Sequence, residues 1–144
     1  MATVEEIETL LGLLMKAPPS ESLQKFDMST AGIRAILKLL NETEGKMTAG
    51  RISELMHVST ARVAVLLKKM TAKGLIEKQT DSEDRRVVVV KLSDSGRATA
   101  EKFKAHLYGN IGDMIDKVGM KKMLEFAAIS GEIHSVMKKP DIDI

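Results

Sequence analysis

The chain has 144 residues, 44% of them hydrophobic, and it carries 22 Lys or Arg against 20 Asp or Glu. This length suits one hydrophobic core with a few peripheral elements and is short for two domains. The chain contains no cysteine, which excludes disulfides, thiolate metal sites and thiol redox sensing. Its apolar runs are far shorter than the roughly 20 residues of a membrane span. Its N-terminus is acidic where a signal peptide is basic, so we expect a cytoplasmic protein that makes no membrane contact.

The charges are unevenly placed along the chain. From Lys46 to Lys104 there are 13 Lys or Arg against 7 Asp or Glu, whereas the rest of the chain has 9 against 13. A basic middle between acidic ends favours a polyanion-binding module carried on a separate scaffold. The alternative is an ordinary solvated surface on which cations cluster by chance.

Two amphipathic helices are predicted in the first third of the chain. Apolar residues recur at helical spacing over residues 3–16, so one face of this helix must be buried, and Pro18 ends it. A second helix is expected to begin with Ser29 or Thr30 as its N-cap and to run to about Thr43.

The next two predicted helices follow each other across a short turn, which is the order of a helix-turn-helix. Thr48 is a suitable N-cap for the first of them. After the turn at His57, the hydroxyl of Ser59 can cap the second, which runs to Lys73. Gly74 is the expected stop.

A β-hairpin is predicted after this pair of helices. Residues 75–80 and 87–92 are two runs rich in Leu, Ile and Val, and the six polar residues between them, 81–86, contain no apolar side chain. This pattern is typical of a hairpin with a long, charged tip. Helix, helix and hairpin together predict a winged helix-turn-helix.

A long helix and a final helix complete the pattern. Ser93 and the acid after it suit the start of a helix that runs to about Val118, with Gly109 and Gly112 as weak points, and Gly119 separates it from the last helix. The last helix is apolar on two sides and has more surface to bury than one small core can cover, which argues for a partner chain. The alternative is that the first and last helices pack on each other within a monomer.

The helix after Ser59 has one face for the core and an opposite face for a ligand. At about 100° per residue, its large apolar side chains group on one side and Ala61, Val65 and Lys68 fall opposite. Small residues near a helix N-terminus permit close approach to base edges, and cations reach phosphates or guanine. The candidate DNA-binding residues of this helix are Ser59, Thr60, Ala61, Arg62, Val65, Lys68 and Lys69.

Individual roles differ along this helix. Arg62 is expected to contact a base or a phosphate, and Lys68 and Lys69 are expected to contact the DNA backbone. Val65 is unusual on a solvated face. It either contacts the methyl group of a thymine or is a scattered surface valine that needs no explanation.

The tip of the hairpin carries two adjacent arginines, Arg85 and Arg86. Arginine suits a narrow minor groove because its guanidinium meets the enhanced negative potential there, and a hairpin tip is slim enough to enter. The neighbouring acids would repel phosphate, so we expect Asp84 to pair with an arginine and to fix the shape of the loop. The alternative is a solvated turn with balanced charge.

These patterns predict a mainly α protein with a small β-hairpin wing. We expect a single domain over residues 1–144. Residues 29–93 are expected to form its winged helix-turn-helix, the DNA-binding region. Residues 1–28 and 94–144 are expected to contribute mainly N- and C-terminal helices to a dimerisation region.

Several short motifs resemble the MarR family of bacterial and archaeal transcription regulators. The element order is similar over the whole chain, and the resemblance is specific from about Ile52 to Arg97. The matching residues are the run from Ser59 to Met70, the segment Lys73-Gly74-Leu75-Ile76, the wing residues Asp81, Asp84, Arg85 and Arg86, and the residues Val90, Leu92, Ser93, Gly96 and Arg97.

This resemblance implies a homodimer built by the terminal helices, with two winged domains on a pseudopalindromic operator in double-stranded DNA, and most often a repressor. It also implies that Arg86 enters the minor groove and that Asp84 braces the wing. Glu83 departs from the family pattern, in which a basic residue is common, so a third wing cation is missing. Members of the family often respond to small-molecule effectors, so such a ligand is implied by the resemblance alone.

The sequence offers no residue set suited to catalysis. It has no nucleophile-base pair, phosphate-cradling glycine loop or ligand cluster, so we expect no enzyme activity and no cofactor. His57, His106 and His134 are widely separated, and no metal site is expected. Two other functions stay open: a winged-helix module for protein interaction, and a non-specific architectural DNA-binding protein. A protein-binding wing would not need the arginine pair, and its binding would depend little on salt.

Overall fold

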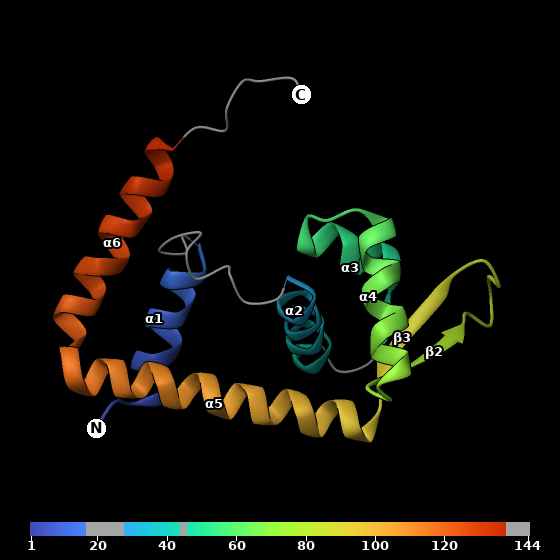
Figure 1. Ribbon diagram of the computed structural model, residues 1–144, viewed down its shortest axis with the longest axis horizontal. Coiled ribbons are helices and arrows are strands. Elements are labelled where there is room, and N and C mark those ends of the chain that lie inside the picture. The colour runs from blue at the N-terminus through green and yellow to red at the C-terminus, as the bar shows by residue number, and fades with distance from the viewer. Residues whose placement is uncertain (17–27, 44–45, 138–144) are drawn as a thin grey trace. The chain divides into compact units, whose positions relative to one another are not determined.

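The structure is a computed structural model that describes residues 1–16, 28–43 and 46–137. It divides into two compact units, which we call the terminal unit, Met1–Lys25 with His106–Ile144, and the winged unit, Phe26–Ala105. The elements in chain order are α1 (Val4–Lys16), α2 (Met28–Glu42), β1 (Met47–Thr48), α3 (Ala49–Met56), α4 (Thr60–Ala72), β2 (Ile76–Thr80), β3 (Val88–Leu92), α5 (Asp94–Val118) and α6 (Met120–Val136) (Figure 1).

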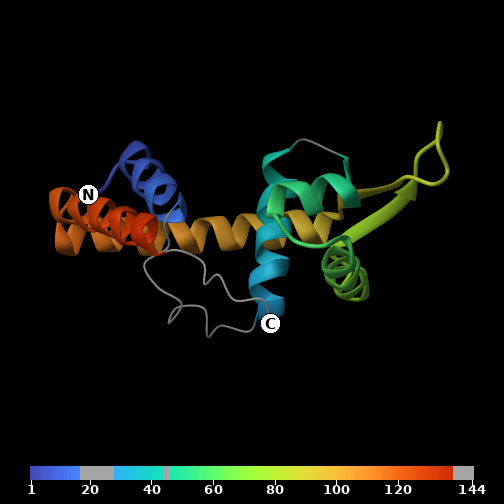
Figure 2. The same ribbon diagram turned by 90° about the horizontal axis from the view of Figure 1, so that it is seen from above.

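The winged unit contains the predicted hairpin and one strand that the sequence did not reveal. Strands β2 and β3 pair antiparallel, with Ile76 opposite Leu92 and Thr80 opposite Val88, so the predicted strands were right to within a residue. The third strand, β1, pairs antiparallel with β3 on its other side, which gives the order β1-β3-β2. Because β1 has two residues, it is too short to show the alternating pattern that marks a strand. Figure 2 shows the tip of the hairpin extending away from α2 and α3.

The core of the winged unit is formed by the inner faces of its helices and one face of the sheet. The apolar face predicted for α4 is the buried one. Its four residues are each at most 2% exposed, namely Val63, Leu66, Leu67 and Met70. Burying side chains of this size contributes about 1.5–3 kcal/mol each to folding. The residues that share this core include Ile36, Leu37, Leu40, Ile52, Val63, Leu66, Leu67, Met70, Val90 and Leu92.

Two of the predicted helix caps are present in the helix-turn-helix. The Thr48 side chain accepts a hydrogen bond from the Arg51 amide at 3.1 Å, and the Ser59 side chain accepts one from the Arg62 amide at 3.1 Å. Between them, His57 has the left-handed conformation with φ 54°, which ends α3. These caps satisfy amides that a helix start leaves without a partner, and they fix where α3 and α4 begin.

The predicted start of α2 was wrong. The helix already includes Met28, so Ser29 and Thr30 lie in its first turn and neither is its N-cap. Pro18, the expected end of the first helix, lies outside the described residues, and α1 itself ends at Lys16 as expected.

The start of α5 is tied to the end of α4. The Ser93 hydroxyl accepts a hydrogen bond from the Gly96 amide at 3.0 Å and donates one to the Gly74 carbonyl at 2.6 Å. The Ser93 amide also donates to the Leu75 carbonyl at 3.0 Å. Gly74 has φ +70°, a conformation that favours glycine, so it ends α4 as predicted. One serine therefore links the stop of α4 to the first turn of α5.

In the terminal unit, α1 packs against α6 and against the second half of α5. In Figures 1 and 2 α1 lies beside α6, and the Tyr108 hydroxyl donates a hydrogen bond to Glu8 at 3.1 Å. The packing of the first helix on the last therefore occurs within one chain. The buried apolar residues of this unit are Ile7, Leu10, Ile111, Ile115, Met123 and Ala127.

The long helix extends to Val118 as predicted. Helix α5 continues unbroken through Gly109 and Gly112. A β-carbon on Gly112 would lie 3.4 Å from the Cδ1 atom of Ile7, so this position of α5 faces α1. Gly119, with φ +94°, separates α5 from α6 as predicted. Among the described residues no helix is both long and apolar enough to cross a membrane.

Candidate nucleic-acid interface

The outer face of α4 presents the residues that the sequence singled out. Residues 59–62, 65, 68 and 69 are all exposed, while Val63 and Leu66 on the opposite side are buried. The Ser59 side chain also caps the helix, so its hydroxyl oxygen is already engaged by a backbone amide at the point where the face begins. A capped, rigid helix with an exposed polar and basic face is a suitable shape for the major groove.

The tip of the wing is shaped by its acids. Asp81 accepts a hydrogen bond from the Glu83 amide at 3.0 Å, and Asp84 accepts one from the Arg86 amide at 3.0 Å. Each is an Asx turn, in which a carboxylate holds the backbone two residues further on. The Asp81 amide donates to the Val87 carbonyl at 2.9 Å, which closes the base of the tip. The acids beside the arginines therefore have a structural role in the loop.

Asp84 also holds the side chain of Arg86. The Arg86 Nε atom donates to Asp84 Oδ1 at 3.1 Å and Nη2 donates to Oδ2 at 3.3 Å, a two-point contact. The side-chain hydrogen bonds from Arg86, and next its backbone amide, lower the pKa of the Asp84 carboxyl below its usual range. The Arg86 side chain is nevertheless 90% exposed. The pairing expected for Asp84 is thus present, and it orients a cation that solvent still reaches.

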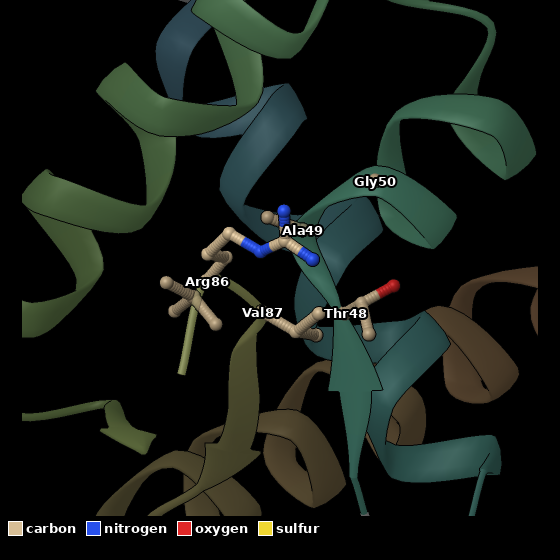
Figure 3. Close-up of a pocket in the computed structure, with 6 residues that line it drawn as sticks. Thr48, Ala49, Gly50, Arg86 and Val87 are labelled. Carbon is tan, nitrogen blue, oxygen red and sulfur yellow. The ribbon is translucent and has the colours of Figure 1, made fainter. Parts of the chain in front are cut away.

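The start of α3 lies beside the base of the wing. Thr48, Ala49 and Gly50 line one side of an open depression of about 420 Å³, and Arg86, Val87 and Val88 line the other. Figure 3 shows the Arg86 side chain reaching toward Ala49. The sequence did not predict that residues 48–50 lie beside residues 86–88, because this proximity follows from the pairing of the two-residue strand β1 with β3.

No metal-binding cluster is found in the part of the chain that the structure describes. There, no group of three or more His, Cys, Asp or Glu could hold a metal ion. The three histidines belong to separate elements: His57 ends α3, His106 lies in α5 beside Asn110, and His134 is in the last turn of α6. The exposed face of α4 carries cations and small side chains, and the tip of the hairpin carries two arginines.

This architecture defines the class: a winged helix-turn-helix protein, with an exposed basic helix and an arginine-bearing wing. A family model described as the MarR family matches residues 28–87. Over these residues the chain is similar to the MarR family.

Known relatives agree with this similarity. The chain is 31% identical over 78 residues to YwaE of Bacillus subtilis (strain 168), an uncharacterized HTH-type transcriptional regulator, covering 54% of this chain and 44% of that protein. It is 24% identical over 127 residues to the HTH-type transcriptional repressor MdtR of the same organism, covering 87% of this chain and 81% of MdtR. The chain thus matches less than half the length of YwaE.

A solved structure extends the likeness beyond the winged unit. A mutant of ZitR from Lactococcus lactis, in its apo form, has a TM-score of 0.59 and 26% sequence identity to this chain. The match covers 94% of this chain and 96% of ZitR, so helices outside the winged unit are included. The fold of the whole chain is accordingly similar to that of ZitR.

Proposed function

We propose that the protein is a transcription regulator that binds double-stranded DNA as a homodimer. It acts as a repressor at a pseudopalindromic operator. The Asp84–Arg86 pair carries the proposal: a two-point contact orients an arginine that is 90% exposed at the tip of the wing. An oriented guanidinium on a slim hairpin matches the narrow minor groove. The match of residues 28–87 to the MarR family and the relatives named as transcriptional regulators support the same function.

In this proposal α4 is the recognition helix. Ser59, Thr60, Ala61 and Arg62, at its N-terminal end, approach base edges in the major groove, as the first residues of a recognition helix do. Lys68 and Lys69, further along, contact phosphates and fix the register of the helix on the duplex. On the wing, Arg86 enters the minor groove and the adjacent cation, Arg85, reaches the flanking backbone.

A second copy of the chain is the proposed partner because α6 leaves an apolar stripe exposed. Met123, Ala127 and Ser130 form its buried face. A separate row on the same helix remains in water and recurs at helical spacing, namely Phe126, Ile129, Ile133 and Val136. An apolar stripe of this kind is a self-association surface, and a two-fold dimer presents two winged units to two half-sites.

Two parts of the proposal rest on the family resemblance. One is a small-molecule effector that releases the DNA, whose identity the residues do not specify. The other is the absence of enzyme activity, which agrees with relatives named as transcriptional regulators. A regulator of bacterial or archaeal genes acts in the cytoplasm, where the DNA lies.

Selection of genomic DNA fragments by the full-length protein tests the function. We expect a few fragments to be enriched, each with two half-sites about 34 Å, or a multiple of that distance, apart. Their affinity should fall steeply between low and high salt, with a log–log slope of about −0.9 per phosphate neutralised. Equal recovery of all fragments would indicate an architectural DNA-binding protein. Absence of salt-dependent binding would indicate a protein-interaction module.

A further inference from the structure

We infer that Val65 reads the methyl group of a thymine in the major groove, so that each half-site of the operator carries a T·A pair at one fixed position. The inference rests on the proposed function and adds a sequence preference to it. It concerns a residue that lies outside the buried stripe of the helix.

Val65 stands at the centre of the outward face of α4. The buried stripe of the helix is formed by Val63, Leu66, Leu67 and Met70. At about 100° per residue, Val65 points nearly opposite to this stripe, in line with Ala61 one turn before it. Arg62 and Lys69 lie to one side of that line. The valine is therefore where an approaching base edge would first meet the helix.

Val65 is not part of the buried core of the winged unit. Its side chain is 49% exposed, and within α4 it is the large apolar residue that remains in water. A β-branched residue is a poorer helix former than alanine because its side chain loses rotamer freedom against the preceding turn. Neither burial nor helix propensity therefore favours valine at this position, whereas a DNA contact would.

The major groove offers a matching group. Among the base edges exposed there, thymine is the base that presents a methyl group, while the others present hydrogen-bond donors and acceptors. Ala61 has a small side chain, which lets the helix backbone come close to the bases on the same line. The cations of the helix can bind phosphates on either side while the valine methyl groups meet the thymine methyl. This arrangement gives discrimination without a hydrogen bond.

The test replaces single thymines by uracil, which removes the methyl group and leaves base pairing intact. Duplexes are first selected from a randomised library with the full-length protein. In the best duplex, each thymine is then replaced in turn, in both half-sites, and the affinity is measured by fluorescence anisotropy at fixed salt. The proteins compared are wild type, Val65→Ala and Val118→Ala. Val118 is a matched control because it is also a helical valine, 47% exposed, and it lies outside the winged unit.

At one thymine position in each half-site, uracil should weaken wild-type binding roughly fourfold per methyl group, the effect of leaving one such group unburied. Val65→Ala should bind the thymine and uracil duplexes equally well, and Val118→Ala should behave as wild type. Uracil effects that are the same in wild type and Val65→Ala would overturn the inference and leave the proposed function intact. A library from which no duplex is enriched would overturn the proposed function and this inference with it.

Discussion

Gly96 lies so close to Leu75 that a β-carbon at position 96 would be 1.9 Å from the Leu75 carbonyl oxygen. That carbonyl also accepts the hydrogen bond from the Ser93 amide. The first turn of α5 therefore rests directly on the backbone that joins α4 to β2, and any side chain at position 96 would push the two apart.

Replacing Gly96 by alanine should destabilise the protein by about 1–3 kcal/mol, the usual result of overpacking against a neighbour that cannot move aside. Chemical denaturation followed by circular dichroism measures the change. Gly109→Ala is the matched control, since nothing lies within 4 Å of the new β-carbon there. In an open helix interior, Gly109→Ala should raise the free energy of unfolding by roughly 0.5–1 kcal/mol. Equal effects of the two changes would contradict the close approach.

Arg86→Ala should weaken operator binding by about 1–3 kcal/mol, a range taken from direct base contacts, and should leave the dimer intact. The reason is that the oriented guanidinium is the group proposed to enter the minor groove. An electrophoretic mobility titration measures the affinity, and light scattering measures the mass. Lys117→Ala removes one positive charge from the terminal unit and should change the affinity much less. Unchanged affinity for Arg86→Ala would rule out its assigned role.

The pKa of Asp84 should rise toward its usual range in the Arg86→Ala variant, because the side-chain hydrogen bonds from Arg86 are the largest cause of its lowered value. A carboxyl whose folded-state pKa is lowered stabilises the folded wing at every pH above its unfolded pKa. This contribution is lost as the pH falls through the lower folded value. Carbon-13 NMR titration of the Asp84 carboxyl measures the midpoint. A midpoint that does not differ between wild type and the variant would show that the pair is not formed in solution.

Ile133→Glu should convert the proposed dimer to a monomer, since it puts a charge in the exposed apolar row of α6. Multi-angle light scattering measures the mass, and circular dichroism checks that the helices are retained. Ala128→Glu is the control on the same helix, because Ala128 is exposed and points roughly 140° away from Ile133 at 3.6 residues per turn. If the Ile133→Glu variant remains a dimer, the interface does not include this row of α6 and lies on another surface.

The features that the sequence predicted well are those with local causes. Thr48 and Ser59 act on amides three residues away, and Asp84 holds a residue two positions on, so each could be inferred from nearby residues. The buried stripe of α4 follows from helical periodicity in the same way. The DNA contacts assigned to α4 and the wing stay predictions.

The features that the sequence did not predict depend on distant parts of the chain. Strand β1 exists because Met47 and Thr48 pair with Val90 and Val89, more than forty residues later. Gly112 was singled out for its poor helix propensity, but its position facing Ile7 is a tertiary contact that propensity does not include. The start of α2 was misplaced because serine and threonine also occur inside the first turn of a helix.

The acids of the wing have a consequence for how the protein would search a genome. The tip, residues 81–86, carries three carboxylates and two guanidinium groups, so its formal charge is slightly negative. On arbitrary DNA such a tip gains little from the phosphates, and the cations of α4 would do more to hold the protein to the duplex. The wing would then shorten the dwell time at wrong sites and lengthen it only where a groove is narrow enough to receive Arg86. Its effect would be seen in dissociation rates more than in association rates.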